Sequence, residues 1–138
     1  MNYFIESPRK LFLTDALGAT LTVALTVGVL ARWTELFGMP AEALFKLAIA
    51  GSMFAVYSFA CCIFVRRNFS PFLRTIALAN VSYCVATMAL CVVYRTQITA
   101  LGWVYFIGEC LVVVALAGVE MRVAAELNKG GGNRLAHR

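Results

Sequence analysis

Four long apolar runs alternate with short polar connectors along the chain. The runs span residues 11–31, 47–65, 75–94 and 96–119, and the only charged residues inside them are Asp15 and Glu109. Each run has about the 20 apolar residues that a membrane-spanning helix needs. Short connectors make consecutive helices antiparallel neighbours. The pattern therefore predicts an all-α integral membrane protein, a four-helix up-and-down bundle.

The three prolines divide the chain in the same way. Pro8, Pro40 and Pro71 each stand just before a run. Proline fits the first position of a helix because the backbone N–H that it lacks would have no partner within the helix there. This predicts helices over 8–36, 40–66, 71–95 and 100–127. The first run is too long for the apolar core of a signal peptide, so we expect a retained helix.

Residues 1–127 are thus expected to form one domain of four transmembrane helices. Residues 128–138 combine three consecutive glycines with several basic residues, a composition typical of a flexible tail. We therefore predict a flexible basic cytoplasmic tail over 128–138.

The basic residues predict the orientation of this domain in the membrane. Nine of the 12 Lys and Arg residues lie on the side of the two termini and three on the other side. Because cytoplasmic segments carry an excess of Lys and Arg, both termini are predicted to be cytoplasmic. The basic residues at the helix ends are expected to contact lipid headgroups: Arg9, Lys10, Arg66, Arg67 and Arg74. Trp33 and Trp103 fall on the opposite side, where indole rings form an interface belt.

The composition excludes several classes of protein. The chain is 62% hydrophobic and 14% charged, whereas a soluble domain is about half apolar and about a quarter charged. A soluble domain of this composition would have too few polar residues to cover its surface. The sequence has no basic face with interleaved aromatic residues, the pattern that indicates nucleic-acid binding. The expected surroundings are the lipid bilayer, with other copies of the chain or other membrane subunits as further partners.

Ionisable residues inside a bilayer are candidates for function because they are costly to bury there. Glu109 falls near the predicted midplane without a basic residue at the same depth, so we expect it to be neutral or hydrogen-bonded within the bundle. Asp15 is predicted to lie nearer the cytoplasmic end. Helical spacing places other polar residues on stripes that can converge with them. The predicted intramembrane polar site consists of Glu109, Asn80, Asp15, Tyr57, Tyr83 and Tyr105.

Other polar residues have simpler interpretations. Gly18, Thr22 and Thr26 recur at four-residue spacing, a pattern typical of close packing between membrane helices. Glu120 lies near Arg122, which indicates a solvated charge at a helix end. The five cysteines all lie inside apolar runs without C-x-x-C or metal-ligand spacing. No catalytic residue, metal site or cofactor is therefore predicted.

Several short segments resemble a family of small bacterial four-helix integral membrane proteins that has no assigned activity. The resemblance is carried by residues 7–13 (SPRKLFL), 15–19 (DALGA), 37–40 (FGMP), 57–59 (YSF), 71–74 (PFLR), 83–84 (YC) and 105–109 (YFIGE), together with Asn80. It covers most of the chain between Ser7 and Glu120. The resemblance implies a multi-pass protein of the bacterial inner membrane and gives no substrate.

Three functions stay open at this point. The first is a small transporter, channel or ligand-binding bundle with a polar site around Glu109. The second is a structural or accessory subunit of a larger membrane complex, in which the polar residues serve as packing contacts. The third, a membrane-embedded enzyme, has no nucleophile–base pair or cofactor motif in its favour.

Overall fold

The chain folds into helices joined by short connectors. A computed structural model describes residues 8–66 and 68–135, and these residues contain no β-strand. The elements are α2 (Pro8–Leu25), a π-helical turn η1 (Thr26–Leu30), α3 (Thr34–Phe37), α4 (Ala41–Phe64), α5 (Phe69–Val93) and α6 (Ala100–Leu135). The predicted four-helix up-and-down bundle is confirmed.

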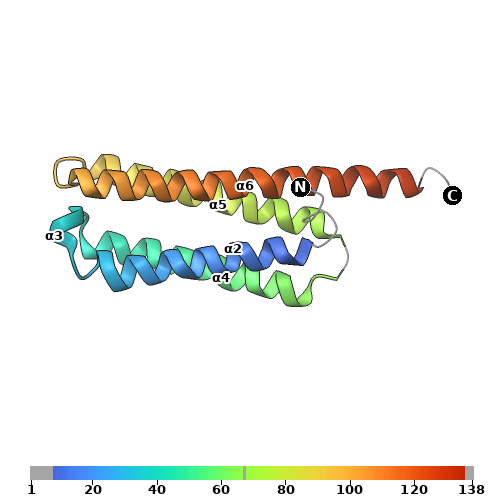
Figure 1. Ribbon diagram of the computed structural model, residues 1–138, viewed down its shortest axis with the longest axis horizontal. Coiled ribbons are helices and arrows are strands. Elements are labelled where there is room, and N and C mark those ends of the chain that lie inside the picture. Colours follow the sequence, from blue (N-terminus) through green and yellow to red (C-terminus); the bar gives the residue numbers. More distant parts are fainter. Residues whose placement is uncertain (1–7, 67, 136–138) are drawn as a thin grey trace.

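The bundle consists of two helical hairpins that form two layers (Figure 1). In the first hairpin α2 packs on α4, and in the second α5 packs on α6. Contact between the hairpins is much less extensive: α4 touches α5 along part of its length, and α2 barely touches α6. Packing is therefore close within each hairpin and loose between them.

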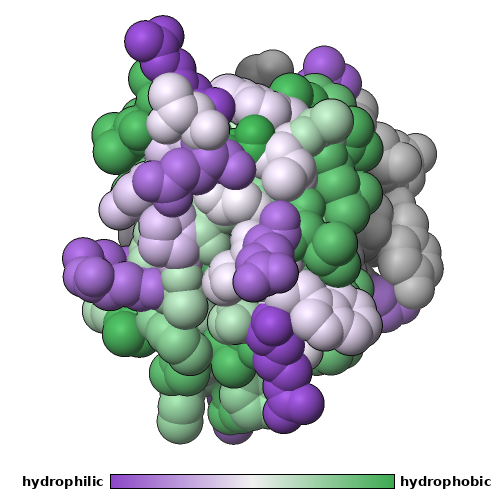
Figure 2. Space-filling view, turned by 90° about the vertical axis from the view of Figure 1, so that its left-hand side faces the viewer, coloured by the Kyte–Doolittle hydropathy of each residue, from purple (hydrophilic) through white to green (hydrophobic). Residues whose placement is uncertain are grey.

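The long helices can each cross a bilayer. The apolar spans are Arg9–Leu30, Ala41–Phe64, Phe69–Val93 and Ala100–Asn128. Large apolar side chains point outward along them, for example Val104 (71% exposed) and Val56 (69%). Hydrophilic side chains gather on the end of the molecule that carries α3 (Figure 2). An apolar flank with a polar end is the surface expected of a membrane protein.

The first helix differs from the continuous helix predicted over 8–36. The backbone widens into η1, where the Ala31 N–H donates to the Thr26 carbonyl at 2.9 Å, and it leaves the helix at Trp33 before α3 begins. Three β-branched residues and Gly28 lie in or beside this turn. These residue types have low helix propensity, which explains why a break is possible without proline.

The last helix is longer than predicted. The structure has residues 128–135 in α6, where the sequence predicts a flexible tail, while residues 136–138 lie outside the described residues. Extending an existing helix adds one hydrogen bond per residue and requires no new nucleation. The glycines oppose this by about 1 kcal/mol each, but no proline blocks the extension.

Close backbone contacts connect the two hairpins at the α3 end. Gly38 ends α3 with φ +76°, and a Cβ atom there would lie 1.9 Å from the Gln97 carbonyl oxygen. The Thr99 hydroxyl donates to the Leu36 carbonyl at 2.5 Å, just before α6 begins. This junction fixes the start of α6 against α3.

The apolar core is divided along the length of the bundle. One cluster lies toward the α3 end and includes Met39, Leu44 and Phe106. The other lies toward the opposite end and includes Leu11, Phe12 and Leu73. Buried polar side chains and a cavity lie between the two clusters.

Candidate functional site: a cavity between the hairpins

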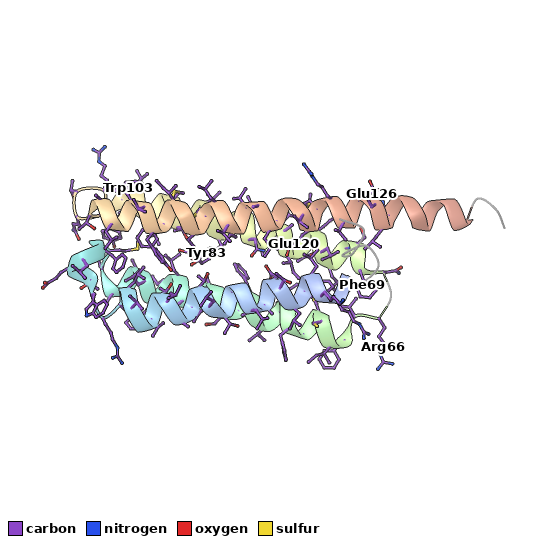
Figure 3. The ribbon with its side chains drawn as sticks, viewed as in Figure 1. Arg66, Phe69, Tyr83, Trp103, Glu120 and Glu126 are labelled. Atoms are coloured by element: carbon purple, nitrogen blue, oxygen red, sulfur yellow. The ribbon has the colours of Figure 1, made fainter. Side chains whose placement is uncertain are left out.

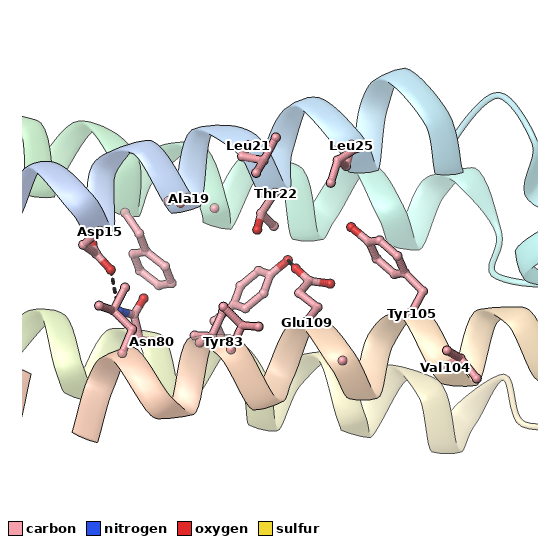
Figure 4. A pocket seen from close by; sticks show the side chains of 17 residues that line it. Asp15, Ala19, Leu21, Thr22, Leu25, Asn80, Tyr83, Val104, Tyr105 and Glu109 are labelled. Atoms are coloured by element: carbon pink, nitrogen blue, oxygen red, sulfur yellow. Dashed lines mark hydrogen bonds between the residues drawn. The ribbon is translucent and has the colours of Figure 1, made fainter. Parts of the chain in front are cut away.

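A cavity of about 390 Å³ lies between the two hairpins. Its walls are mostly apolar, and most of its lining residues come from α2 and α6 (Figure 4). Several of them also belong to the outer surface, including Leu21 (61% exposed) and Val112 (70%). The cavity therefore opens sideways between α2 and α6, toward the space that lipid occupies.

Glu109 is the central polar group of this cavity. Its carboxylate accepts a hydrogen bond from the Tyr83 hydroxyl at 3.0 Å. The side chain lies on α6, and Tyr83 reaches it from α5 of the same hairpin (Figure 4). The predicted hydrogen bonding of Glu109 within the bundle is thus observed, and the carboxyl group borders open space.

Aromatic rings line the same cavity as this carboxyl group. Tyr105 points across the cavity toward α2 (Figure 4) and packs edge-on against Phe37 at 5.8 Å between ring centroids. Phe54 packs edge-on against Tyr83 at 6.5 Å. Both tyrosines and Phe54 line the cavity, which combines one carboxyl group with aromatic walls.

A second polar cluster lies at one end of the cavity and joins all four long helices. Ser58 on α4 donates a short hydrogen bond to Asp15 on α2. The amide of Asn80 on α5 donates to Asp15 at 2.7 Å and to Glu120 on α6 at 3.4 Å. Asp15, Ser58, Asn80 and Glu120 are all buried, and we call them the carboxyl cluster.

Five of the six residues predicted for the intramembrane polar site line the cavity: Asp15, Asn80, Tyr83, Tyr105 and Glu109. Tyr57 does not. It is 37% exposed and lies in a separate surface groove with Phe64 and Phe72. Successive residues of a helix point about 100° apart, so α4 turns Ser58 into the bundle and Tyr57 out of it.

Asp15 is more enclosed than its predicted depth indicates. It is 2% exposed, and its carboxylate binds Ser58 and Asn80 inside the bundle. The sequence predicts only that Asp15 lies nearer the cytoplasmic end than Glu109. The hydroxyl donor on α4 and the amide donor on α5 stabilise the Asp15 carboxyl group inside the bundle.

The predicted solvated position of Glu120 at a helix end is wrong. The side chain is 0% exposed, and Figure 3 shows it between the two layers of the bundle. Spacing along α6 could have revealed this: Glu120 follows Glu109 by three turns and therefore lies on the same face. Its proximity to Arg122 in sequence was misleading, since Arg122 points outward and is exposed.

The predicted packing role of Gly18, Thr22 and Thr26 is wrong for the first two residues. Both line the cavity, and a Cβ atom added to Gly18 would have no neighbour within 4 Å. Thr26 is buried and does not line the cavity. Close packing of α2 also occurs at Gly51 of α4, where an added Cβ would lie 3.0 Å from Val23.

The residues predicted for the membrane interface lie at the two ends of the bundle. Arg9, Lys10, Arg66 and Arg74 are exposed near the ends of α2, α4 and α5 that lie away from α3, and Arg67 lies outside the described residues. Trp33 is exposed beside α3, whereas Trp103 is partly buried against the neighbouring apolar cluster (Figure 3). The two tryptophans thus share one end of the molecule.

The cysteines are placed for packing. Cys84 on α5 and Cys110 on α6 face each other, and each thiol contacts the backbone carbonyl of the other at 3.8–3.9 Å. No group of three or more His, Cys, Asp or Glu side chains within residues 8–66 and 68–135 is arranged to hold a metal ion.

Comparison with protein-family models, with curated proteins and with solved structures gives no match for this chain.

Proposed function

We propose that the protein is a small membrane transporter or ligand-binding protein that takes up an amphipathic organic cation in the cavity between the hairpins. The observation that carries this proposal is the position of Glu109: its carboxyl group, held by Tyr83, borders an apolar-walled cavity of about 390 Å³. Ligand sites are typically concave, mostly apolar and equipped with a few polar groups.

The chemistry of the cavity favours a cation with apolar substituents. A carboxylate attracts a positive charge strongly where water is scarce, and the faces of aromatic rings attract cations as well. Tyr83, Tyr105 and Phe54 provide such rings beside Glu109. The apolar walls are complementary to the hydrocarbon part of the same molecule.

The lateral opening supports entry from the bilayer. Leu25 and Val104 line the cavity and are also exposed on the outer surface of α2 and α6. A molecule dissolved in the membrane can therefore reach Glu109 without crossing a polar layer. The role of an accessory subunit has less support, because Gly18 and Thr22 border the cavity instead of forming a packing contact.

We also propose that the protein resides in the bacterial inner membrane with both termini in the cytoplasm. The distribution of nine basic residues against three supports this orientation. The resemblance to small bacterial membrane proteins supports the location.

Binding of benzyltrimethylammonium to the purified protein tests the proposed function. The expected result is saturable binding by calorimetry, with affinity lowered at least tenfold in Glu109→Gln, since the amide cannot neutralise the cation. Gly108→Leu should abolish binding, because Gly108 lines the cavity and the added side chain fills open space there.

Two matched variants serve as controls. Glu35→Gln removes the same charge from exposed α3, and Gly118→Leu adds the same side chain to an open position of α6 away from the cavity. Both should bind like the wild type. Equal affinity of the wild type and Glu109→Gln would overturn the proposal.

A further inference from the structure

The carboxyl cluster has an imbalance between hydrogen-bond donors and acceptors. Asp15 and Glu120 together present four carboxyl oxygens inside the bundle. Ser58 supplies one hydrogen and Asn80 supplies two, and these reach both oxygens of Asp15 and Oε2 of Glu120. The fourth oxygen, Oε1 of Glu120, is buried and has no hydrogen-bond partner among the described residues.

A single proton corrects this imbalance. Placed on Glu120, whose carboxyl group shares the amide of Asn80 with Asp15, it supplies a hydrogen at the unpaired oxygen and removes one of two like charges. Two carboxylates that share a site do not both ionise readily. A metal ion fits less well, because the NH₂ group of Asn80 already occupies the position between the two carboxyl groups.

The geometry points to the carboxyl cluster as an intramembrane proton-binding site that holds the two hairpins together. Asp15 and Ser58 belong to the first hairpin, and Asn80 and Glu120 belong to the second. Loss of the proton leaves two like charges facing each other across a loosely packed boundary. Asp15 also lines the cavity, so separation of the hairpins at this cluster widens the cavity.

Other titratable groups lie near the cluster and must be distinguished from it. On the cavity side these are Glu109, Tyr83 and Tyr105. On α4 the thiol of Cys61 is buried, and on α6 Arg122 is exposed. On α2, Arg9 and Lys10 are exposed near its start, and on α5 Arg74 is exposed. Glu109 is a half-buried carboxyl group of the same helix that lines the cavity, and it therefore provides the matched control.

Stability as a function of pH tests this proposal, independently of any ligand at Glu109. A carboxyl group in water is ionised at neutral pH, so the folded protein retains a proton that the unfolded chain releases. Stability must then fall as pH rises, and the equilibrium constant for unfolding should increase up to tenfold per pH unit. Reversible unfolding in mixed micelles of dodecyl maltoside and SDS measures this slope.

Substitution removes this proton and its contribution to the slope. Glu120→Gln carries permanent amide hydrogens in place of the proton, so its stability should fall less steeply with rising pH than that of the wild type. Infrared spectroscopy of the folded wild type should show the carbonyl stretch of a protonated carboxylic acid, and this band should decrease in Glu120→Gln. If Glu120→Gln does not fold, Asp15→Asn tests the same prediction from the other carboxyl group.

Glu109→Gln should retain the part of the slope that Glu120→Gln loses, because the two carboxyl groups lie in separate surroundings. A wild-type stability that is independent of pH, or a slope in Glu120→Gln as steep as that of the wild type, would overturn the proposal. Ligand binding is not measured in this experiment, so its failure would leave the proposed function of the cavity unaffected, and failure of ligand binding would leave the proton site unaffected.

Discussion

Asn80 is the residue on which the polar contacts between the hairpins depend most. Its side-chain amide donates to Asp15 of the first hairpin and to Glu120 of its own hairpin. Both carboxyl groups lie away from water, where an unpaired polar atom is more costly than at a surface. One amide therefore stabilises two buried carboxyl groups.

Replacing this amide should destabilise the fold. We expect Asn80→Ala to lower the free energy of unfolding by about 1–3 kcal/mol, because carboxyl oxygens lose their donors and remain buried. Reversible unfolding in mixed micelles measures this change. Ser82→Ala is the control on the same helix, since Ser82 is exposed and bonds only to the Leu78 carbonyl of its own helix. Equal stability of the two variants would contradict the assigned role of Asn80.

At the scale of elements, α6 has two different surroundings along its length. Near its start it is in close contact with α3, because a Cβ atom on Gly102 would lie 2.1 Å from the Phe37 carbonyl oxygen. From Val104 onward it borders the cavity, and a Cβ atom on Gly108 would have no neighbour within 4 Å. The helix is thus fixed at one end and has free space beside its middle.

The same substitution should therefore have opposite effects at these two glycines. Gly108→Ala should stabilise the protein by about 0.5–1 kcal/mol, since alanine loses less backbone entropy in a helix. Gly102→Ala should destabilise it, because the added methyl group overlaps with backbone that cannot move away without displacing α3. The midpoints of unfolding of the two variants measure the difference. A stabilising Gly102→Ala would contradict the described junction.

For the whole molecule, the sequence was sufficient to predict the four helices and their order. The lengths of the four apolar runs and the positions of the three prolines indicate these features. The hydrogen bond between Glu109 and a neighbouring helix was predictable because an unpaired charge is costly inside a bilayer. The rotation of each helix was harder to predict. Tyr57 and Ser58 are adjacent in sequence, and only the packing of α4 decides which of them enters the bundle.

The loose boundary between the hairpins could not be predicted from sequence either. A stripe of small residues such as Gly18 and Thr22 is compatible with close packing or with open space, and the partner helix determines which occurs. Glu120 was misplaced because its neighbour in sequence, Arg122, indicated solvent. The cavity and the carboxyl cluster both result from how the two hairpins meet.

Photolabelling tests most directly whether the cavity between the hairpins is a binding site. A photoreactive derivative of benzyltrimethylammonium, activated with the protein in lipid nanodiscs, should label α2 and α6 at residues that line the cavity, such as Leu21, Thr22, Val104 and Val112. Mass spectrometry locates the labels, and excess unlabelled cation or Glu109→Gln should remove them. Labels confined to the outer faces of α2 and α4, for example at Leu17 and Phe59, and unchanged in Glu109→Gln would contradict this account.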